Sequence, residues 1–161
     1  MTMTVGTKLP EMNHKVVEGD GVAERSTTDI FGGRKVALFA VPGAFTPTCH
    51  QKHLPGFLEH ADALKAKGVD AIYCITVNDP FVAESWAEAT GAKGKVNVIA
   101  DGNAEFTKAV GMDIDLSVAQ LSVRSKRYAA LVEDGEVKAL NIEETPSSAE
   151  RSSAQELLKS L

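Results

Sequence analysis

The sequence predicts an α/β domain in which a central mixed β-sheet is flanked by helices. Two apolar runs, at residues 35–41 and 69–77, suit strands that are covered on both faces, and residues 95–100 predict a further short strand. Segments of helical periodicity alternate with these runs, which is typical of an α/β architecture. An Asp-Gly pair between two further strand-like runs adds an antiparallel hairpin. The 161 residues suit a single domain, residues 1–161.

The first elements of the chain are short. Residues 1–30 are rich in loop-forming residues, with two brief extended runs around a turn signal, EGDG at 18–21. The stretch TTDIFGG predicts a short helical turn closed by Gly32 and Gly33. The run KVALFAV, residues 35–41, then predicts the first buried strand.

A helix is predicted over residues 54–67. Leu54, Ala61 and Leu64 recur at the spacing that places apolar side chains on one helix face. Pro55 lies inside this pattern and predicts a kink or break, because proline lacks the backbone N–H of a regular helix.

The middle of the chain repeats the alternation of strand and helix. The strand-like run VDAIYCITV is followed by a helix from Pro80 to about Thr90, for which Asp79 is the expected cap. The run at 95–100 is followed by a short helix over residues 103–110. Residues 112–125 show no regular pattern and are predicted to be irregular.

The last segments predict a hairpin and a terminal helix. Residues 127–133 and 136–142 are strand-like and are joined through the Asp-Gly turn. Ser147 and Glu150 have the spacing of a capping box, so the terminal helix is expected to begin near Ser147.

Composition excludes several classes of partner. The net charge is −5, from 17 basic and 22 acidic residues, which argues against binding to nucleic acid. We see no run of 18 apolar residues, so no membrane span is predicted. The first residues, MTMTVGTKLPEMNHK, lack the layout of a signal peptide. Two cysteines are too few for a disulfide framework, so we expect a cytoplasmic protein with reduced thiols.

The stretch VPGAFTPTCHQKHLPGF, residues 41–57, contains one of those cysteines, Cys49. A thiol reacts as the thiolate, which a helix N-terminus and a nearby cation favour. Cys49 lies at the predicted helix start, Thr46 can offer a hydroxyl, and RSKR at 124–127 offers cations. The competing interpretation is a small buried apolar residue, but such cysteines seldom lie in a turn rich in Pro, Gly and Thr.

The segment PGAFTPTC, from Pro42 to Cys49, resembles the PxxxTxxC active-site signature of peroxiredoxins. With HLPGF after it, the stretch is similar to the type II or peroxiredoxin-five group. The resemblance extends through VNDPFV, RSKRYAALVEDGEVKALNIE and the terminal helix, and so covers nearly the whole chain. It implies a thioredoxin-like fold and an antioxidant enzyme that reduces hydrogen peroxide and alkyl hydroperoxides.

The resemblance also implies roles for individual residues. Cys49 would be the peroxidatic cysteine, whose thiolate attacks the peroxide and becomes a sulfenic acid. Thr46 would bind the peroxide and the thiolate, and Pro42 would shield the sulfur from water. Arg127, just before an aromatic residue, would hold the thiolate and polarise the peroxide.

Backbone N–H groups would complete the substrate site. The resemblance implies that those of Cys49 and of Ala44 or Phe45 orient the peroxide oxygens. Phe45 belongs to the signature turn, which in related proteins contributes to a homodimer contact, so a homodimer is expected.

The sulfenic acid must then be reduced. The segment NIEETPSSAERSSAQELLKSL holds no cysteine, and Cys74 lies in the middle of a buried strand. Cys74 is therefore predicted to be a core residue, and the cycle to use one cysteine and an external thiol. In related proteins this thiol is usually glutathione, with glutaredoxin as partner, and thioredoxin is the alternative. No other cofactor is expected.

Other interpretations are weaker but remain open. Cys49 and His53 are spaced like a metal pair, yet further ligands are missing, and we predict the histidines at the surface or rim. A cysteine hydrolase would need a base that nothing singles out. A redox sensor or chaperone of this fold would react once with peroxide, whereas a peroxidase turns over with a thiol reductant. Trp86 is predicted to pack in the core, and the acids at 133–134 and 143–144 to be solvated loop charges.

Overall fold

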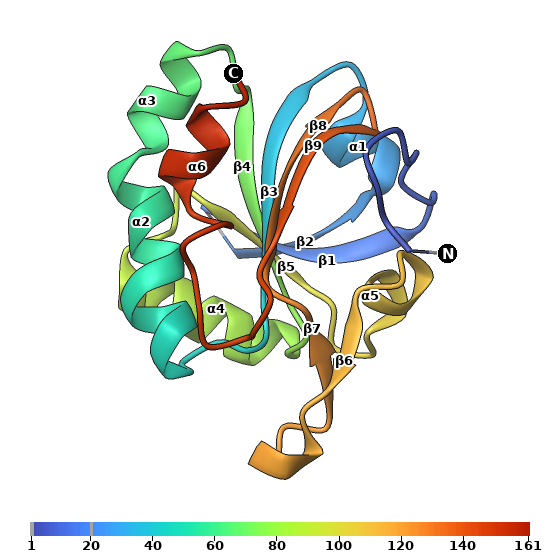
Figure 1. The fold of residues 1–161 in the computed structure, drawn as a ribbon, viewed down its shortest axis with the longest axis vertical. Coiled ribbons are helices and arrows are strands. Elements are labelled where there is room, and N and C mark those ends of the chain that lie inside the picture. Colours follow the sequence, from blue (N-terminus) through green and yellow to red (C-terminus); the bar gives the residue numbers. More distant parts are fainter. Residues whose placement is uncertain (1, 20) are drawn as a thin grey trace.

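The structure, a computed structural model, describes residues 2–19 and 21–161. In this part of the chain, seven strands form one mixed sheet in the order β2-β1-β5-β4-β3-β8-β9 (Figure 1). The strands are β1 (Asn13–Glu18), β2 (Gly21–Ser26), β3 (Lys35–Val41), β4 (Ala71–Thr76), β5 (Asn97–Ala100), β8 (Tyr128–Glu133) and β9 (Glu136–Ile142). The sequence therefore predicted the mixed sheet correctly, including the three strands at its centre.

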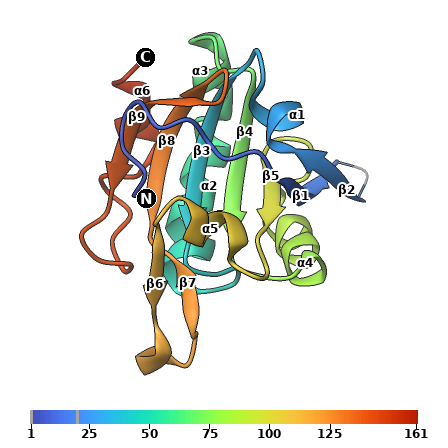
Figure 2. The ribbon, with the colours of Figure 1, turned by 90° about the vertical axis from the view of Figure 1, so that its right-hand side faces the viewer.

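Helices cover both faces of this sheet (Figures 1 and 2). One face carries η1 (Cys49–His53), α2 (Leu54–Glu59), α3 (Ala61–Ala66), α4 (Pro80–Thr90) and α6 (Ala154–Leu158). The other face carries α1 (Thr27–Phe31) and α5 (Glu105–Ala109). Each face has its own apolar core, and Trp86 is fully buried in the first of them, as predicted. Among the described residues, no helix is long and apolar enough to span a membrane.

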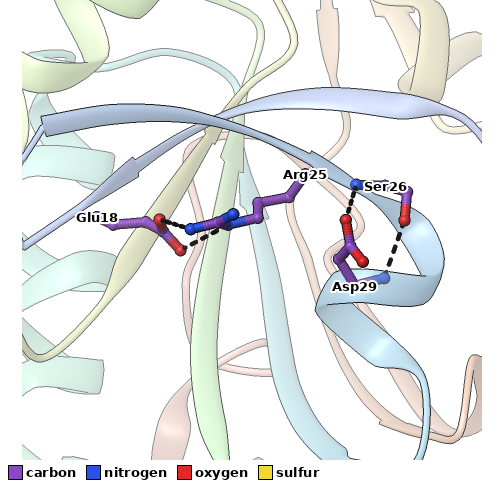
Figure 3. A network of polar contacts seen from close by, with 4 residues as sticks. All are labelled: Glu18, Arg25, Ser26 and Asp29. Carbon is purple, nitrogen blue, oxygen red and sulfur yellow. Dashed lines mark hydrogen bonds and ion pairs between the residues drawn. The ribbon is translucent and has the colours of Figure 1, made fainter.

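The β1–β2 hairpin forms one edge of the sheet. Glu18 pairs with Gly21 across the predicted turn, whose residue Asp20 lies outside the described residues. Arg25 on β2 donates two hydrogen bonds to Glu18 on β1 (Figure 3). This exposed pair is expected to contribute little stability. The capping box of Ser26 and Asp29 starts α1, the predicted helical turn, and Gly32 closes it.

Residues 112–125 differ from the prediction. They contain a small second sheet of β6 (Asp113–Asp115) and β7 (Val123–Ser125), with the short helix η2 (Ser117–Ala119) at its tip. This hairpin projects from the body of the protein (Figure 2). Strands of three residues are too short to show an alternating pattern, so no signal predicts them from the sequence.

The terminal helix begins later than predicted. Its cap is Ser153, whose hydroxyl accepts the N–H of Glu156, and not the predicted pair of Ser147 and Glu150. The Ser-x-x-Glu spacing thus occurs twice near the end of the chain. Tertiary contacts of the residues between Glu143 and Ser152 decide that the second pair forms the cap.

Strand direction brings the predicted active-site segments together. Strands β3, β4 and β5 are parallel, so their carboxyl ends lie at one edge of the sheet. Strand β8 is antiparallel to β3, and Tyr128, its first residue, pairs with Ala40. The loop after β3, which leads to Cys49, and Arg127, which precedes β8, therefore meet at the same edge.

Candidate active site

Cys49 is the first residue of the π-helical turn η1 and has no exposed surface. The N–H of Leu54 donates to the carbonyl of Cys49, one residue further along than in an α-helix. The irregularity predicted at Pro55 takes this form, because the proline has no N–H for a regular helical bond. The helical segment therefore begins at Pro47, two residues before Cys49, instead of at Leu54, and it is interrupted again at His60, between α2 and α3.

Arg127 contacts the sulfur directly. Its Nη2 donates to Sγ of Cys49 at 2.9 Å. Nε donates to the carbonyl of Pro146 at 3.0 Å, and Nη1 to Nδ1 of His53 at 3.0 Å. The side chain is only 2% exposed, so three partners fix a buried guanidinium. A cation at this distance binds a thiolate more strongly than a neutral thiol.

His53 is buried, so its predicted place at the surface or rim was wrong. Its Nε2 lies 2.8 Å from the carbonyl of Ser152, which can only accept, so Nε2 carries the proton and Nδ1 accepts from Arg127. Burial, and then the charge of Arg127, lower the pKa of His53 to about 3. The imidazole is therefore neutral near pH 7, and neither ring nitrogen is free to bind a metal.

The buried His53 predicts a loss of stability in acid. Its pKa is about 3 in the folded chain and 6.5 without perturbation, so between these values only the unfolded chain binds the proton. The free energy of unfolding should fall, as pH is lowered through this window, by up to about 1.4 kcal/mol per pH unit. Urea unfolding over about pH 4 to 7 measures this slope.

A His53→Gln variant should show a shallower slope, and His60→Gln, at a half-buried histidine, should keep the wild-type slope. Burial also lowers the pKa of His14, which contributes in the same direction and leaves part of the slope in both variants. Parallel curves for the wild type and His53→Gln would contradict this account of His53.

The prediction for Glu143 was also wrong, because this side chain is buried and is not a solvated loop charge. Its carboxylate accepts the N–H and the hydroxyl of Ser152, both at 2.6 Å. Its own N–H donates to the carbonyl of Arg127 at 3.0 Å. The segment from Glu143 to Ser152 therefore closes around the arginine and presents the Ser152 carbonyl to His53. Glu144, Glu133 and Asp134 are exposed, as predicted.

The turn after β3 holds Pro42 and Thr46 close to the helix start. Pro42 is buried, in keeping with a shielding role. The hydroxyl of Thr46 donates to the carbonyl of Gly43 at 2.7 Å, so its proton is not directed at Cys49. Its lone pairs remain available to accept a hydrogen bond from a bound peroxide. The carbonyl of Thr46 accepts the N–H of His50, which joins the turn to the helix.

Ala44 and Phe45 are placed differently from each other. The N–H of Ala44 donates to Oδ1 of Asn78 at 2.8 Å, so it is already paired and its predicted role toward the peroxide is not supported. Phe45 has a positive φ of 62° and is 48% exposed. Its ring stacks on His50, whose Nδ1 accepts from Nε1 of Trp86. The predicted role of the Phe45 N–H stays a prediction.

Cys74 lies in the central strand β4 and has no exposed surface. It belongs to the same apolar core as Cys49, beneath the helical layer, and both thiols are free. Burial raises the pKa of Cys74 well above its ordinary value, so this thiol stays protonated near neutral pH. A protonated thiol is a poor nucleophile.

Comparisons with known proteins show the family of this chain. Residues 4–158 match the Redoxin family. The chain is 51% identical to peroxiredoxin-2E-2, chloroplastic, from Oryza sativa subsp. japonica, over 99% of this chain and 73% of the relative. It is 43% identical to reduced Prx3 of Vibrio vulnificus, solved in complex with H₂O₂, with a TM-score of 0.90 over 98% of this chain and 95% of that one. A Plasmodium falciparum antioxidant protein, a 1-Cys peroxiredoxin, is 29% identical, with a TM-score of 0.87 over 96% of each chain.

Proposed function

The chain belongs to the Redoxin family and is a peroxiredoxin of thioredoxin-like fold, a thiol-dependent peroxidase with an antioxidant function, and from this premise we propose that Cys49 is its peroxidatic cysteine and that an external thiol completes the cycle. The observation that carries the proposal is the hydrogen bond of 2.9 Å from Arg127 to Sγ of Cys49. It places a fixed cation against a thiol at a helix start, which suits a nucleophilic thiolate.

The first half of the cycle is a two-electron oxidation of sulfur. The Cys49 thiolate attacks one oxygen of the peroxide, an S–O bond forms and the O–O bond breaks. The departing oxygen takes both electrons of that bond and a proton, and leaves as water or an alcohol, while Cys49 becomes a sulfenic acid. Arg127 faces the reacting atoms and stabilises the negative charge that moves from sulfur to the leaving oxygen.

The second half requires a reductant from outside the chain. Cys49 lies in the helical layer and Cys74 in the sheet beneath it. A disulfide needs Cα atoms roughly 4.4–6.8 Å apart, whereas packed layers such as two stacked sheets lie about 10 Å apart. One thiol attacks the sulfenic acid and releases water, and a second thiol reduces the mixed disulfide. Glutathione with glutaredoxin is our first candidate, and thioredoxin the alternative. The similarity to a 1-Cys peroxiredoxin supports this cycle.

Intact mass spectrometry after one equivalent of hydrogen peroxide tests the proposal. We expect a species one oxygen heavier, which glutathione converts to an adduct at Cys49. A species two hydrogens lighter would mean that Cys49 pairs with Cys74 and would overturn the one-cysteine cycle. An unchanged mass would contradict the assignment of Cys49 as the peroxidatic residue.

We further propose that the protein is a homodimer whose contact includes Phe45. This side chain is 48% exposed and lies on the turn beside the active site, and Phe81 on α4 is also strongly exposed. Exposed aromatic side chains are enriched at protein interfaces. Sedimentation velocity should give a dimer for the wild type and a smaller species for Phe45→Glu. Exposed Lys52 supplies the control, Lys52→Glu, and a monomeric wild type would refute the dimer.

The cellular location stays a prediction. The sequence led us to expect the cytoplasm, whereas the rice relative is chloroplastic by name. We retain the cytoplasm as our proposal, and cell fractionation with an antibody against the protein would test it.

A further inference from the structure

We propose that Arg124 is a positioning residue for the peroxidase reaction, because it holds the turn from Pro42 to Thr46 in place from the projecting β6–β7 hairpin. Arg124 lies on β7, where it pairs with Ile114 of β6. It lies three residues before Arg127 in the chain. Both arginines thus reach the active-site region from residues 124–127. Arg124 does so through Pro42 and Arg127 through Cys49.

The guanidinium of Arg124 is fixed at both ends. Its Nε donates to the carbonyl of Leu121, within its own hairpin, at 2.8 Å. Its Nη1 donates to the carbonyl of Pro42 at 3.1 Å. In the described residues it forms no ion pair, so its charge-assisted hydrogen bonds go to two backbone carbonyls. The hairpin and the turn, 82 residues apart in the chain, are joined through this side chain.

Gly43 provides the space for this contact. A Cβ atom built at Gly43 would lie 2.4 Å from Nη1 of Arg124, closer than real Cβ atoms approach other atoms. It would also lie 3.3 Å from Cγ2 of Thr46. Any side chain at this position must therefore displace the guanidinium, and glycine is required for close approach and not for an unusual φ.

The consequence for the reaction passes through Thr46. Gly43, which leaves room for the guanidinium, accepts the Thr46 hydroxyl at its carbonyl at 2.7 Å. Fixing Pro42 and Gly43 therefore fixes the hydroxyl that is expected to accept a hydrogen bond from the peroxide. Arg124 makes no hydrogen bond to Cys49 in the described residues, so its loss should disturb the placement of the peroxide more than the state of the sulfur. Misplacement of a reacting group by about 1 Å can reduce a rate roughly 100-fold.

The inference rests on peroxidase activity and is independent of which thiol reduces the enzyme. The experiment compares two reactions of Cys49 in the same preparation, oxidation by hydrogen peroxide and alkylation by iodoacetamide. Arg124→Ala should lower the rate constant for peroxide by roughly 10- to 100-fold and leave the alkylation rate unchanged. Lys126→Ala, which removes the same charge from the same segment, should change neither rate. A wild-type enzyme without a peroxide reaction would refute the proposed function instead.

Gly43→Ala provides a second, independent arm. It should reproduce the selective loss of Arg124→Ala, and the double variant should be no slower than either single variant, because both disrupt one contact. If Arg124→Ala does not fold, Arg124→Lys is tested instead. Lysine keeps the positive charge but lacks the paired donors of the guanidinium, so the peroxide rate should fall by a smaller factor while the alkylation rate stays unchanged. An unchanged peroxide rate, an equal loss of both rates or additive losses in the double variant would overturn the inference.

Discussion

Replacing Cys49 by serine should abolish peroxide reduction. The oxygen of serine is a far weaker nucleophile toward peroxide than a thiolate, and no other described thiol faces Arg127. We expect the rate constant for hydrogen peroxide to fall by at least about 10⁴-fold, to the uncatalysed background. Stopped-flow measurement of peroxide consumption with excess dithiol as reductant checks this. Because serine is smaller and fills the same buried position, the variant should remain folded.

Cys74→Ser is the matched control, since Cys74 has the same burial and lies in the same apolar core. It should keep most of the peroxide reduction and most of the turnover with an external thiol. A variant that is folded but does not turn over would show that Cys74 resolves the sulfenic acid, and the one-cysteine cycle would then be wrong. Activity that survives in Cys49→Ser would remove Cys49 from the catalytic role.

Loss of Arg127 should have the second-largest effect. Its Nη2 is the donor aimed at the reacting sulfur, and removal of one such donor typically reduces a rate by about 10²- to 10³-fold. Arg127→Gln is the informative variant, because it keeps a polar chain of similar reach without the charge. The expected result is a loss of this size in the peroxide reaction, together with slower alkylation of Cys49 at neutral pH.

The slower alkylation distinguishes Arg127 from Arg124, for which the alkylation rate should not change. Arg151→Gln is a suitable control, because Arg151 forms an exposed ion pair with Glu144. That variant should behave as the wild type in both reactions. An unaltered peroxide rate in folded Arg127→Gln would exclude Arg127 from the catalytic site.

Local sequence determined most of the fold. The runs that form β3 and β4 are continuous in the chain and apolar, so burial on both faces could be inferred without any partner. The Asp-Gly turn between β8 and β9 and the cap at Asp79 depend on neighbouring residues alone. The signature from Pro42 to Cys49 is likewise contiguous, and it is the basis on which Cys49 is proposed as the reactive thiol.

The errors occurred where a residue's environment is made by distant parts of the chain. His53 lies 99 residues from Ser152 and 74 from Arg127, and nothing near it in sequence shows that both partners will enclose it. Glu143 resembles any acid at the end of a hairpin until the segment before α6 folds back onto it. The terminal helix begins at Ser153, the second of two equivalent caps, because the residues from Glu143 to Ser152 fold around Arg127.

The sequence by itself therefore determined the strands of the large sheet, the alternation with helices, the proposal of Cys49 as the reactive thiol and, through resemblance, of Arg127 as its partner. Only the tertiary structure decided how that arginine is held, which nitrogen of His53 carries the proton, and that Arg124 reaches Pro42 over Gly43. The physical reason is that secondary structure follows from spacing along the chain. A buried hydrogen bond, in contrast, requires two groups at about 3 Å in a fixed orientation, and only the packed sheet and its loops set that distance.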